Sequence, residues 1–289
     1  GRLETPEGFV YEGTWRDGQI DGRGTITHPS GDVYEGELVD GRRDGQGRVV
    51  QANGDVYEGA FDNDQRHGQG VFIGTDGYRY DGNWVSGQME GAGTITYPDG
   101  SVYTGQLRAN LPNGQGTITY VGGATYEGDW VEGVIQGQGV ATYPDGLVYE
   151  GAFRNARNHG YGVMTRPDGY RYEGEWQDGE RHGRGVARYP DGSVYDGQFR
   201  EGERHGEGTI TMESGFTYAG TWVRGEIEGE GVATYANGDV YEGAFERGKR
   251  EGQGTMRYAS GEEASGEWIN GALAVPTSVT DPEEMPAAE

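Results

Sequence analysis

The stretch RYEGEWQDGERHGRG, residues 171–185, concentrates side chains that bind metals or transfer protons. Those side chains are Glu173, Glu175, Asp178, Glu180 and His182. A catalytic or metal-binding group of residues normally occurs once in a chain, whereas a structural module is normally repeated. The same letters recur along the whole sequence, which favours the structural interpretation.

The repeat has a period of 23 residues and no insertions. A tyrosine occupies the first position of eleven consecutive units, and Ala264 occupies that position in a twelfth. The units begin at residues 11, 34, 57, 80, 103, 126, 149, 172, 195, 218, 241 and 264. Glycine follows two residues after each first position, and Trp, Phe or Leu follows after four. Further glycines stand eleven, thirteen and twenty residues after each tyrosine.

Each unit shows the alternation of two short β-strands separated by a Gly-rich link. In the unit that starts at Tyr172, the first strand places Tyr172, Gly174 and Trp176 on one face, opposite Gly185 and Ala187. Aromatic rings on this face can cover the bare backbone of the glycines. The segment YPDGSVY supplies the turn to the next unit, because Pro fixes φ and Asp-Gly tolerates left-handed geometry.

The sequence therefore predicts an all-β fold, an elongated single-layer antiparallel sheet of about twelve stacked 23-residue β-hairpins, twisted or curved like a solenoid. The predicted array covers residues 1–271, with 1–10 as the second half of an earlier unit at an N-terminal edge that looks cut. The unit at Ala264 is interpreted as a C-terminal cap, with Glu262 and Glu263 discouraging further strand pairing.

Residues 272–289 leave the pattern and form an acidic tail rich in Pro and Ala, which we expect to be disordered. An alternative is that Leu273, Val275 and Val279 fold back onto the open edge of the array or occupy the groove of a partner.

Composition excludes several classes of function. The chain has 48 acidic and 23 basic residues, a net charge of −25, and Lys249 as its one lysine. This charge argues against nucleic-acid binding and makes binding to anionic membranes unfavourable. Cysteine is absent, which excludes disulfides and thiolate metal sites, and no apolar run reaches about 18 residues. The compartment is left open, with a soluble, cytoplasmic protein favoured.

The unit YEGEWQDGERHGRGVARYPDGSV, residues 172–194, closely resembles the MORN (membrane occupation and recognition nexus) repeat. The resemblance implies a curved sheet of stacked hairpins that acts as a scaffold or protein-binding module, often self-associating, with lipid association disputed. It does not imply catalysis. The chain departs from the pattern where glycine is usual seven residues after the tyrosine, at Asp64, Asn110 and Ala156, and in the aromatic column, at Leu38 and Leu107.

The histidines and carboxylates do not predict an active site. His182 shares its column with His67, His159 and His205, but other units have Asp, Glu, Asn or Gln there. Zinc ligands lie about 2.1 Å from the metal, whereas three consecutive repeats span about 20 Å. Carboxylates such as Glu173 and Glu175 recur without a distinctive neighbour in one copy. We therefore predict no catalytic residue, no metal site and no cofactor.

The aromatic stripe is the best candidate for a binding surface, because a single curved sheet covers that face only in part. We predict a groove that binds protein or peptide segments, formed by Tyr80, Trp84, Tyr126, Trp130, Tyr172, Trp176, Tyr218 and Trp222. Trp268, Leu273 and Val275 are candidates for homodimer or edge contacts. Two alternatives are a glycan-binding module that uses the aromatics as stacking platforms and a membrane-surface module.

Overall fold

A computed structural model describes residues 1–280, in which every regular element is a β-strand. The chain divides into two compact units, Gly1–Pro144 and Asp145–Glu289. The first unit contains β1(Arg2–Glu4), β2(Val10–Arg16), β3(Gln19–Thr27), β4(Val33–Val39), β5(Arg42–Val50), β6(Val56–Asp62), β7(Gln65–Ile73), β8(Arg79–Val85), β9(Gln88–Thr96), β10(Val102–Arg108), β11(Leu111–Thr119), β12(Thr125–Val131) and β13(Val134–Thr142).

The second unit continues the same alternation of seven-residue and nine-residue strands. Its strands are β14(Val148–Arg154), β15(Arg157–Thr165), β16(Arg171–Gln177), β17(Glu180–Arg188), β18(Val194–Arg200), β19(Glu203–Thr211), β20(Thr217–Val223), β21(Glu226–Thr234), β22(Val240–Glu246), β23(Lys249–Arg257), β24(Glu263–Ile269) and β25(Ala272–Thr280).

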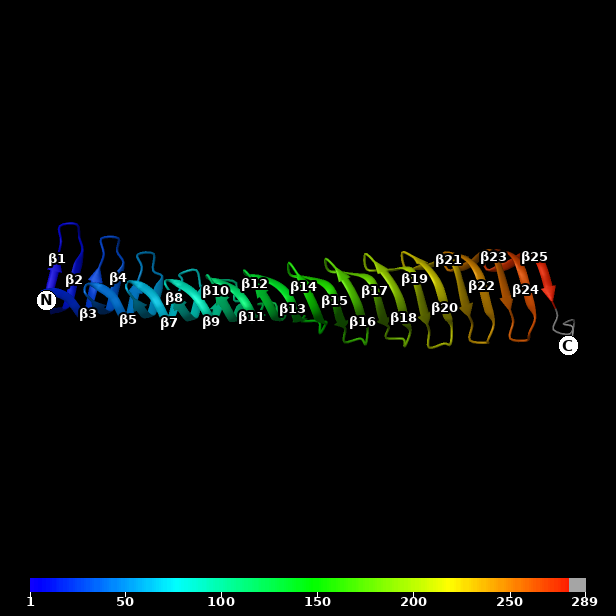
Figure 1. Cartoon of the computed structure of the whole chain (residues 1–289), viewed down its shortest axis with the longest axis horizontal. Helices are drawn as coiled ribbons and strands as arrows, with labels where there is room; N and C mark the ends of the chain where they lie inside the picture. Colours follow the sequence, from blue (N-terminus) through cyan, green and yellow to red (C-terminus); the bar gives the residue numbers. More distant parts are fainter. Residues whose placement is uncertain (281–289) are drawn as a thin grey trace. The chain divides into compact units, whose positions relative to one another are not determined.

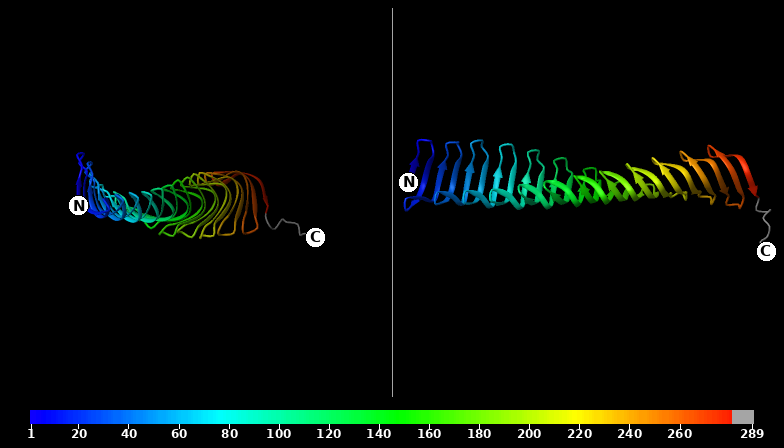
Figure 2. Two further views of the ribbon diagram at one scale, coloured as in Figure 1. Left: turned by 60° about the vertical axis from the view of Figure 1, so that its left-hand side comes forward. Right: turned by 45° about the horizontal axis from the view of Figure 1, so that its top comes forward.

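Within each unit, every strand pairs antiparallel with its neighbours in sequence (Figure 1). Figure 2 shows from two further sides that the strands of each unit follow one another in one layer, with nothing packed on top in the part of the chain described. The predicted all-β class of stacked antiparallel hairpins is confirmed.

The link inside each hairpin is shorter than the sequence suggested. Asp178 and Gly179 both have positive φ, 52° and 97°, which is the geometry of a two-residue hairpin turn. The second strand therefore starts at Glu180, and the segment ERHG belongs to the strand rather than to a loop. The turn between hairpins agrees with the prediction, because the Asp191 carboxylate accepts a hydrogen bond from the Ser193 amide at 2.9 Å.

A β-bulge bends each hairpin at its glycines. Gly174 pairs with Gly185, but the next pair is Trp176 with Arg181, so the two strands contribute unequal numbers of residues between these pairs. Such a shift bends a strand locally. The bend brings the strand pair around the ring of Tyr172, because a Cβ added to Gly185 would lie only 2.6 Å from Cε2 of that ring. The glycines are therefore required by the close approach of the ring.

The C-terminal end differs from the prediction. Residues 272–280 form β25, which pairs with β24 over its whole length, so the expectation of disorder is wrong for these residues. The alternative that Leu273, Val275 and Val279 fold back onto the edge of the array describes them better. For the same reason Glu263 is not at the last edge, since β24 has a partner strand. The rest of the expected tail, 281–289, lies outside the described residues.

Candidate interaction surface

The eight aromatic residues predicted to line a groove form the core of the array. None of Tyr80, Trp84, Tyr126, Trp130, Tyr172, Trp176, Tyr218 and Trp222 is more than 6% exposed. Tyr172 illustrates the packing, since its ring meets Trp176 edge-on at 5.2 Å and Phe199 of the next hairpin at 5.0 Å. Edge-to-face contacts at these distances are favourable. These side chains hold neighbouring hairpins together and offer little surface to a ligand.

The polar atoms of these core aromatics are also satisfied. The Tyr172 hydroxyl donates to the Glu175 carbonyl at 2.9 Å, and the Trp176 indole N–H donates to the Gly162 carbonyl at 3.1 Å. The same tyrosine bond recurs in all eleven repeats that begin with tyrosine. Burial raises the pKa of these phenols, for example that of Tyr57 to about 12, because the charged form loses its hydration.

We call the side of the sheet that carries the first-position tyrosines the aromatic face. A column of arginines lies on this face, nine residues after the tyrosine: Arg43, Arg66, Arg181, Arg204 and Arg250. Each guanidinium stacks over an aromatic ring of the next hairpin, with Arg204 4.4 Å from the centre of the Trp222 ring. Cation–π contacts of this kind are favourable. Sequence reasoning missed the column because it assigned these positions to the Gly-rich link between the two strands of a repeat.

Four of these arginines have no carboxylate partner. Arg43 pairs with Asp64 at 3.2 Å. No ion pair between residues 1 and 280 includes Arg66, Arg181, Arg204 or Arg250. This is unexpected in a chain with about two acidic residues for each basic one. All four guanidinium groups lie over aromatic rings. Those of Arg181, Arg204 and Arg250 also donate to backbone carbonyls.

A second tyrosine column borders the aromatic face, at the last position before the turn between hairpins. We call these six residues the rim tyrosines: Tyr97, Tyr120 and Tyr143 in the first unit, and Tyr189, Tyr235 and Tyr258 in the second. Their rings are partly open to solvent, with exposures of 39% for Tyr120 and 42% for Tyr143. The alternation of Gly185, Ala187 and Tyr189 along the chain is consistent with a position on the aromatic face. The sequence did not indicate that the rim is exposed while the first-position column is buried.

One depression beside the rim tyrosines lies near the C-terminal end of the second unit. It has a volume of about 530 Å³ and is lined by residues that include Tyr235, Arg250, Tyr258 and Trp268. Aromatic rings form its sides and a guanidinium lies within it. Asp239 also lines the depression, so it offers apolar surface together with charges of both signs.

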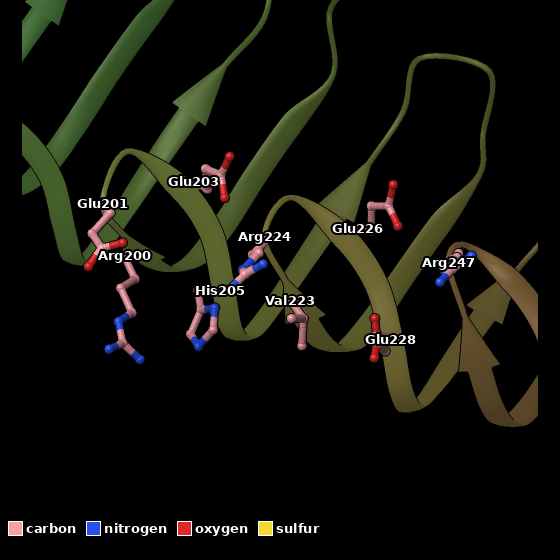
Figure 3. Close-up of a pocket in the computed structure, with 9 residues that line it drawn as sticks. All are labelled: Arg200, Glu201, Glu203, His205, Val223, Arg224, Glu226, Glu228 and Arg247. Carbon is pink, nitrogen blue, oxygen red and sulfur yellow. The ribbon is translucent and has the colours of Figure 1, made fainter.

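The opposite face carries charges of both signs. A depression of about 620 Å³ lies at the two-residue turns of the second unit. Figure 3 shows its lining residues, which include Arg200, Glu203, His205 and Glu228. No group of three His, Asp or Glu residues in the described part of the chain is arranged to hold a metal ion. His182 and His205 line one shallow depression but come from different hairpins.

The residues predicted to make edge contacts lie in three different environments. Trp268 is buried, at 3% exposure, and stacks on Tyr241 of the preceding hairpin. Leu273 pairs with Trp268 across the last hairpin, so it completes the core. Val275 is 55% exposed on β25, the outermost strand of the described array. Of the three, only Val275 is open to a partner.

None of the elements described between residues 1 and 280 is a helix that could cross a membrane.

A comparison with known protein families identifies the repeat. The family model of the MORN repeat matches eleven consecutive segments: residues 11–33, 34–56, 57–77, 80–102, 103–125, 126–148, 149–169, 172–194, 195–217, 218–240 and 241–263. The hairpin formed by β24 and β25 lies beyond these matches. No protein among the curated ones matches the chain.

Solved structures show only distant similarity. The TCP domain of SAS-4 (dCPAP) from Drosophila melanogaster, in complex with a proline-rich motif of Ana2 (dSTIL), is 14% identical over 59% of this chain and 86% of that one, with a TM-score of 0.34. The TCP10 domain of Danio rerio CPAP, in complex with a peptide of STIL, is 15% identical over 96% of this chain and 97% of that one, with a TM-score of 0.25. At TM-scores this low, nothing about the partners of this chain follows.

Proposed function

Because the chain belongs to the MORN repeat family, we propose that it is a non-catalytic scaffold that binds segments of other proteins along its aromatic face. The observation that carries this proposal is the column of partly exposed rim tyrosines beside a closed aromatic core. Tyrosine combines a large apolar area with a hydroxyl, and it is enriched where proteins bind one another. The rings of Tyr97, Tyr189 and Tyr235 each pack against a neighbouring aromatic ring, so these three lose little side-chain freedom on binding.

The spacing of the rim tyrosines favours an extended partner. Tyr97, Tyr120 and Tyr143 belong to three consecutive repeats of the first unit. Neighbouring strands lie about 4.8 Å apart, so equivalent residues of successive hairpins are about 10 Å apart. A small molecule would contact one such ring, whereas a protein segment that follows the sheet would contact several in turn.

The glycan alternative has less support, because glycan binding uses exposed ring faces. Five of the six tryptophans are at most 6% exposed, and only Trp15 is open, at 39%. The membrane alternative is opposed by the net charge of −25.

Site-specific photo-crosslinking in the native cell tests the proposal. A photoreactive phenylalanine analogue is placed at Tyr120 on the rim. The matched control places the same analogue at Glu127, which lies in the next repeat of the first compact unit. Glu127 is exposed, and it alternates with the buried Tyr126 along β12, so it belongs to the opposite face. We expect the Tyr120 position to give discrete adducts whose cross-linked peptides come from a few proteins, and the Glu127 position to give none of them.

The identity of the cross-linked peptides separates the remaining forms of the proposal. Peptides of other proteins support a scaffold for partners, whereas peptides of this same sequence support self-association. Equal adducts at Tyr120 and Glu127, or no adducts at Tyr120 with a correctly folded chain, would contradict binding along the aromatic face.

A further inference from the structure

We propose that Arg181 and Arg204 dock two carboxylates of an acidic partner segment that lies along the aromatic face of the second unit in a polyproline II conformation. This inference rests on the proposed function and specifies the partner. Its starting point is that neither arginine has a carboxylate partner within the described residues, although the chain has 48 acidic side chains.

The two guanidinium groups are held in similar positions, with the difference that Arg181 also donates from Nη1 to the Tyr170 hydroxyl. Arg181 donates to the Gly202 carbonyl at 2.5 Å, and Arg204 donates to the Gly225 carbonyl at 2.8 Å. Arg181 stacks over Phe199 at 5.5 Å, and Arg204 over Trp222 at 4.4 Å. Rings and backbone thus fix the plane of each group.

The fixed guanidinium of Arg204 has N–H donors that make no hydrogen bond within the described residues. Guanidinium has five N–H donors, and Arg204 directs only Nη2 to a protein acceptor. No side-chain nitrogen or oxygen that is fully shielded from solvent lacks a partner in residues 1–280, so the unused donors of Arg204 reach solvent. A guanidinium that is stacked on its face and open at its edge is arranged to receive a carboxylate.

The charges around this pair favour an anion more than those around the other arginines. The column that precedes the tyrosine by two residues faces the same side of the sheet. Around Arg181 and Arg204 this column holds Tyr170, Ser193 and Phe216, which carry no charge. In the corresponding place, Arg66 has Asp55 and Arg250 has Asp239.

Two further groups face this part of the aromatic face. Arg166 adds a positive charge, with its guanidinium 5.2 Å from the centre of the Tyr170 ring. Asp191 is already engaged by the Ser193 amide and hydroxyl, which lower the pKa of its carboxyl. Arg166, Arg181 and Arg204 thus place three positive charges on the aromatic face of a segment, residues 166–204, that as a whole carries seven arginines and nine acidic residues.

The repeat length selects the conformation of the partner. Arg181 and Arg204 are one repeat apart, which is two strand spacings or about 9.6 Å. A polyproline II helix advances about 9.3 Å in three residues and returns to the same face. An α-helix needs seven residues and about 10.5 Å to return to nearly the same face, and a β-strand presents the same face every two residues or about 6.6 Å. Acidic side chains at i and i+3 of a polyproline II segment therefore fit the arginine pair best.

The test uses synthetic peptides and the full chain. The probe is a fluorescein-labelled peptide that repeats Glu-Pro-Pro three times, and binding is followed by fluorescence anisotropy. Comparison peptides repeat Gln-Pro-Pro, Lys-Pro-Pro or Glu-Pro, the last changing the spacing of the acids while keeping their charge. We expect the Glu-Pro-Pro peptide to bind at least about tenfold more tightly than each of the others, since two charge-assisted hydrogen-bonded pairs are at stake.

Variants of the protein locate the site. R181Q and R204Q should each weaken binding of the Glu-Pro-Pro peptide about tenfold or more. The control R200Q removes the same charge from β18, where the side chain of Arg200 is exposed and adjacent in sequence to the core residue Phe199, and should leave binding unchanged. Near-ultraviolet circular dichroism verifies that the aromatic core of each variant is intact. If R181Q or R204Q fails to fold, the comparison of Glu and Gln peptides on the unmodified chain still decides the question.

Several results would overturn the inference. These are equal binding of the Glu-Pro-Pro and Gln-Pro-Pro peptides, equal binding of the Glu-Pro-Pro and Glu-Pro peptides, unchanged binding to a folded R181Q and R204Q double variant, or binding of anionic vesicles that requires the same arginines. Adducts at Tyr120 in the native cell together with no preference for acidic peptides would leave the scaffold function standing and refute only the acidic partner.

Discussion

Two tyrosine columns of the second unit differ in almost everything but their residue type. Tyr172 is fully buried and hydrogen-bonded to the backbone, whereas the rim tyrosine Tyr258 is 37% exposed. The ring of Tyr172 lies over a pair of glycines, and a Cβ added to Gly185 would meet its hydroxyl within 2.4 Å. Tyr258 stands at the end of a strand, just before a turn. This difference indicates that a tyrosine becomes buried in the core where glycines lie opposite its ring, and that the residue type alone does not determine its burial.

The largest expected effect is loss of the array at alkaline pH. Burial raises the pKa of the Tyr57 and Tyr103 phenols to about 12, above the value of about 10 for an unfolded chain. A raised folded-state pKa means that the neutral phenol is favoured by folding, so its contribution to stability is complete below pH 10 and is lost as the pH rises through 12. With a buried tyrosine in eleven repeats, we expect cooperative unfolding in this range.

Phenolate absorbance at 295 nm and far-ultraviolet circular dichroism, recorded together, check this expectation. A large part of the phenolate signal should appear only as the β-sheet signal disappears. Complete ionisation of all tyrosines with an intact sheet signal would mean that the first-position column is not buried as described.

The next largest expected effect is a difference in stability between a variant of the first-position tyrosines and a variant of the rim tyrosines. Tyr172→Ala removes a ring that fills the bend of its hairpin and should lower the free energy of unfolding by about 4 kcal/mol. Tyr258→Ala removes a partly solvated ring and should cost less than about 1 kcal/mol. Hydrogen exchange measured along the chain checks both, because stability in a repeat array is local. Similar loss of protection around β16 and around β23 would break the distinction between core and rim.

Glycine substitution tests the explanation for this distinction. A Cβ on Gly174 would lie 2.5 Å from the Gly185 Cα and 2.6 Å from the Arg184 carbonyl oxygen, so the backbone must move to admit it. We expect Gly174→Ala to cost about 3 kcal/mol. Gly122→Ala is the control, because nothing lies within 4 Å of its Cβ position and its φ is not positive. A shift of the thermal midpoint with Gly174→Ala no larger than that with Gly122→Ala would refute the role of the facing glycines.

The sequence was sufficient to predict the fold because the same pattern of strand residues occurs in eleven repeats. The alternation of Tyr172, Gly174 and Trp176 placed these residues on one face, and the structure has them there, opposite Gly185 and Ala187. The turn at Asp191 and Gly192 also follows from residue type. Each of these features depends on neighbours in sequence or on a single hairpin.

The parts that sequence reasoning missed depend on finer signals or on neighbouring hairpins. The Asp-Gly pair at Asp178 is a strong signal for a two-residue turn, and using it would have placed Arg181 on a strand. The Asn-Gly pair before β25 would likewise have indicated a twelfth complete hairpin. Arg204 stacks over Trp222 of the next hairpin, so the residue pattern within a single 23-residue repeat cannot predict this contact. The burial of the groove residues follows from the same contacts between hairpins.

The smallest predicted effect concerns the repeat without a tyrosine. In the last hairpin Ala264 replaces the tyrosine, and Val275 and Thr277 replace the glycines found eleven and thirteen residues later in the other repeats. A Cβ added to Gly266 would lie 3.0 Å from Leu273 Cδ1, which shows that Leu273 occupies part of the space beside this glycine.

If the facing glycines create the core, Ala264→Tyr should not repair this hairpin. The larger ring would meet Leu273 and the backbone of Val275 and Pro276, which lie beside Gly266, so we expect a loss of about 2 kcal/mol in local stability from overpacking. Pro276→Gly in the same chain should recover part of that loss, because Pro276 is the residue that pairs with Gly266 in this hairpin. Hydrogen exchange of β24 and β25 in the single and double variants is the measurement. A gain in protection with Ala264→Tyr alone would show that tyrosine builds the core without glycines, and the distinction between the two columns would then need another cause.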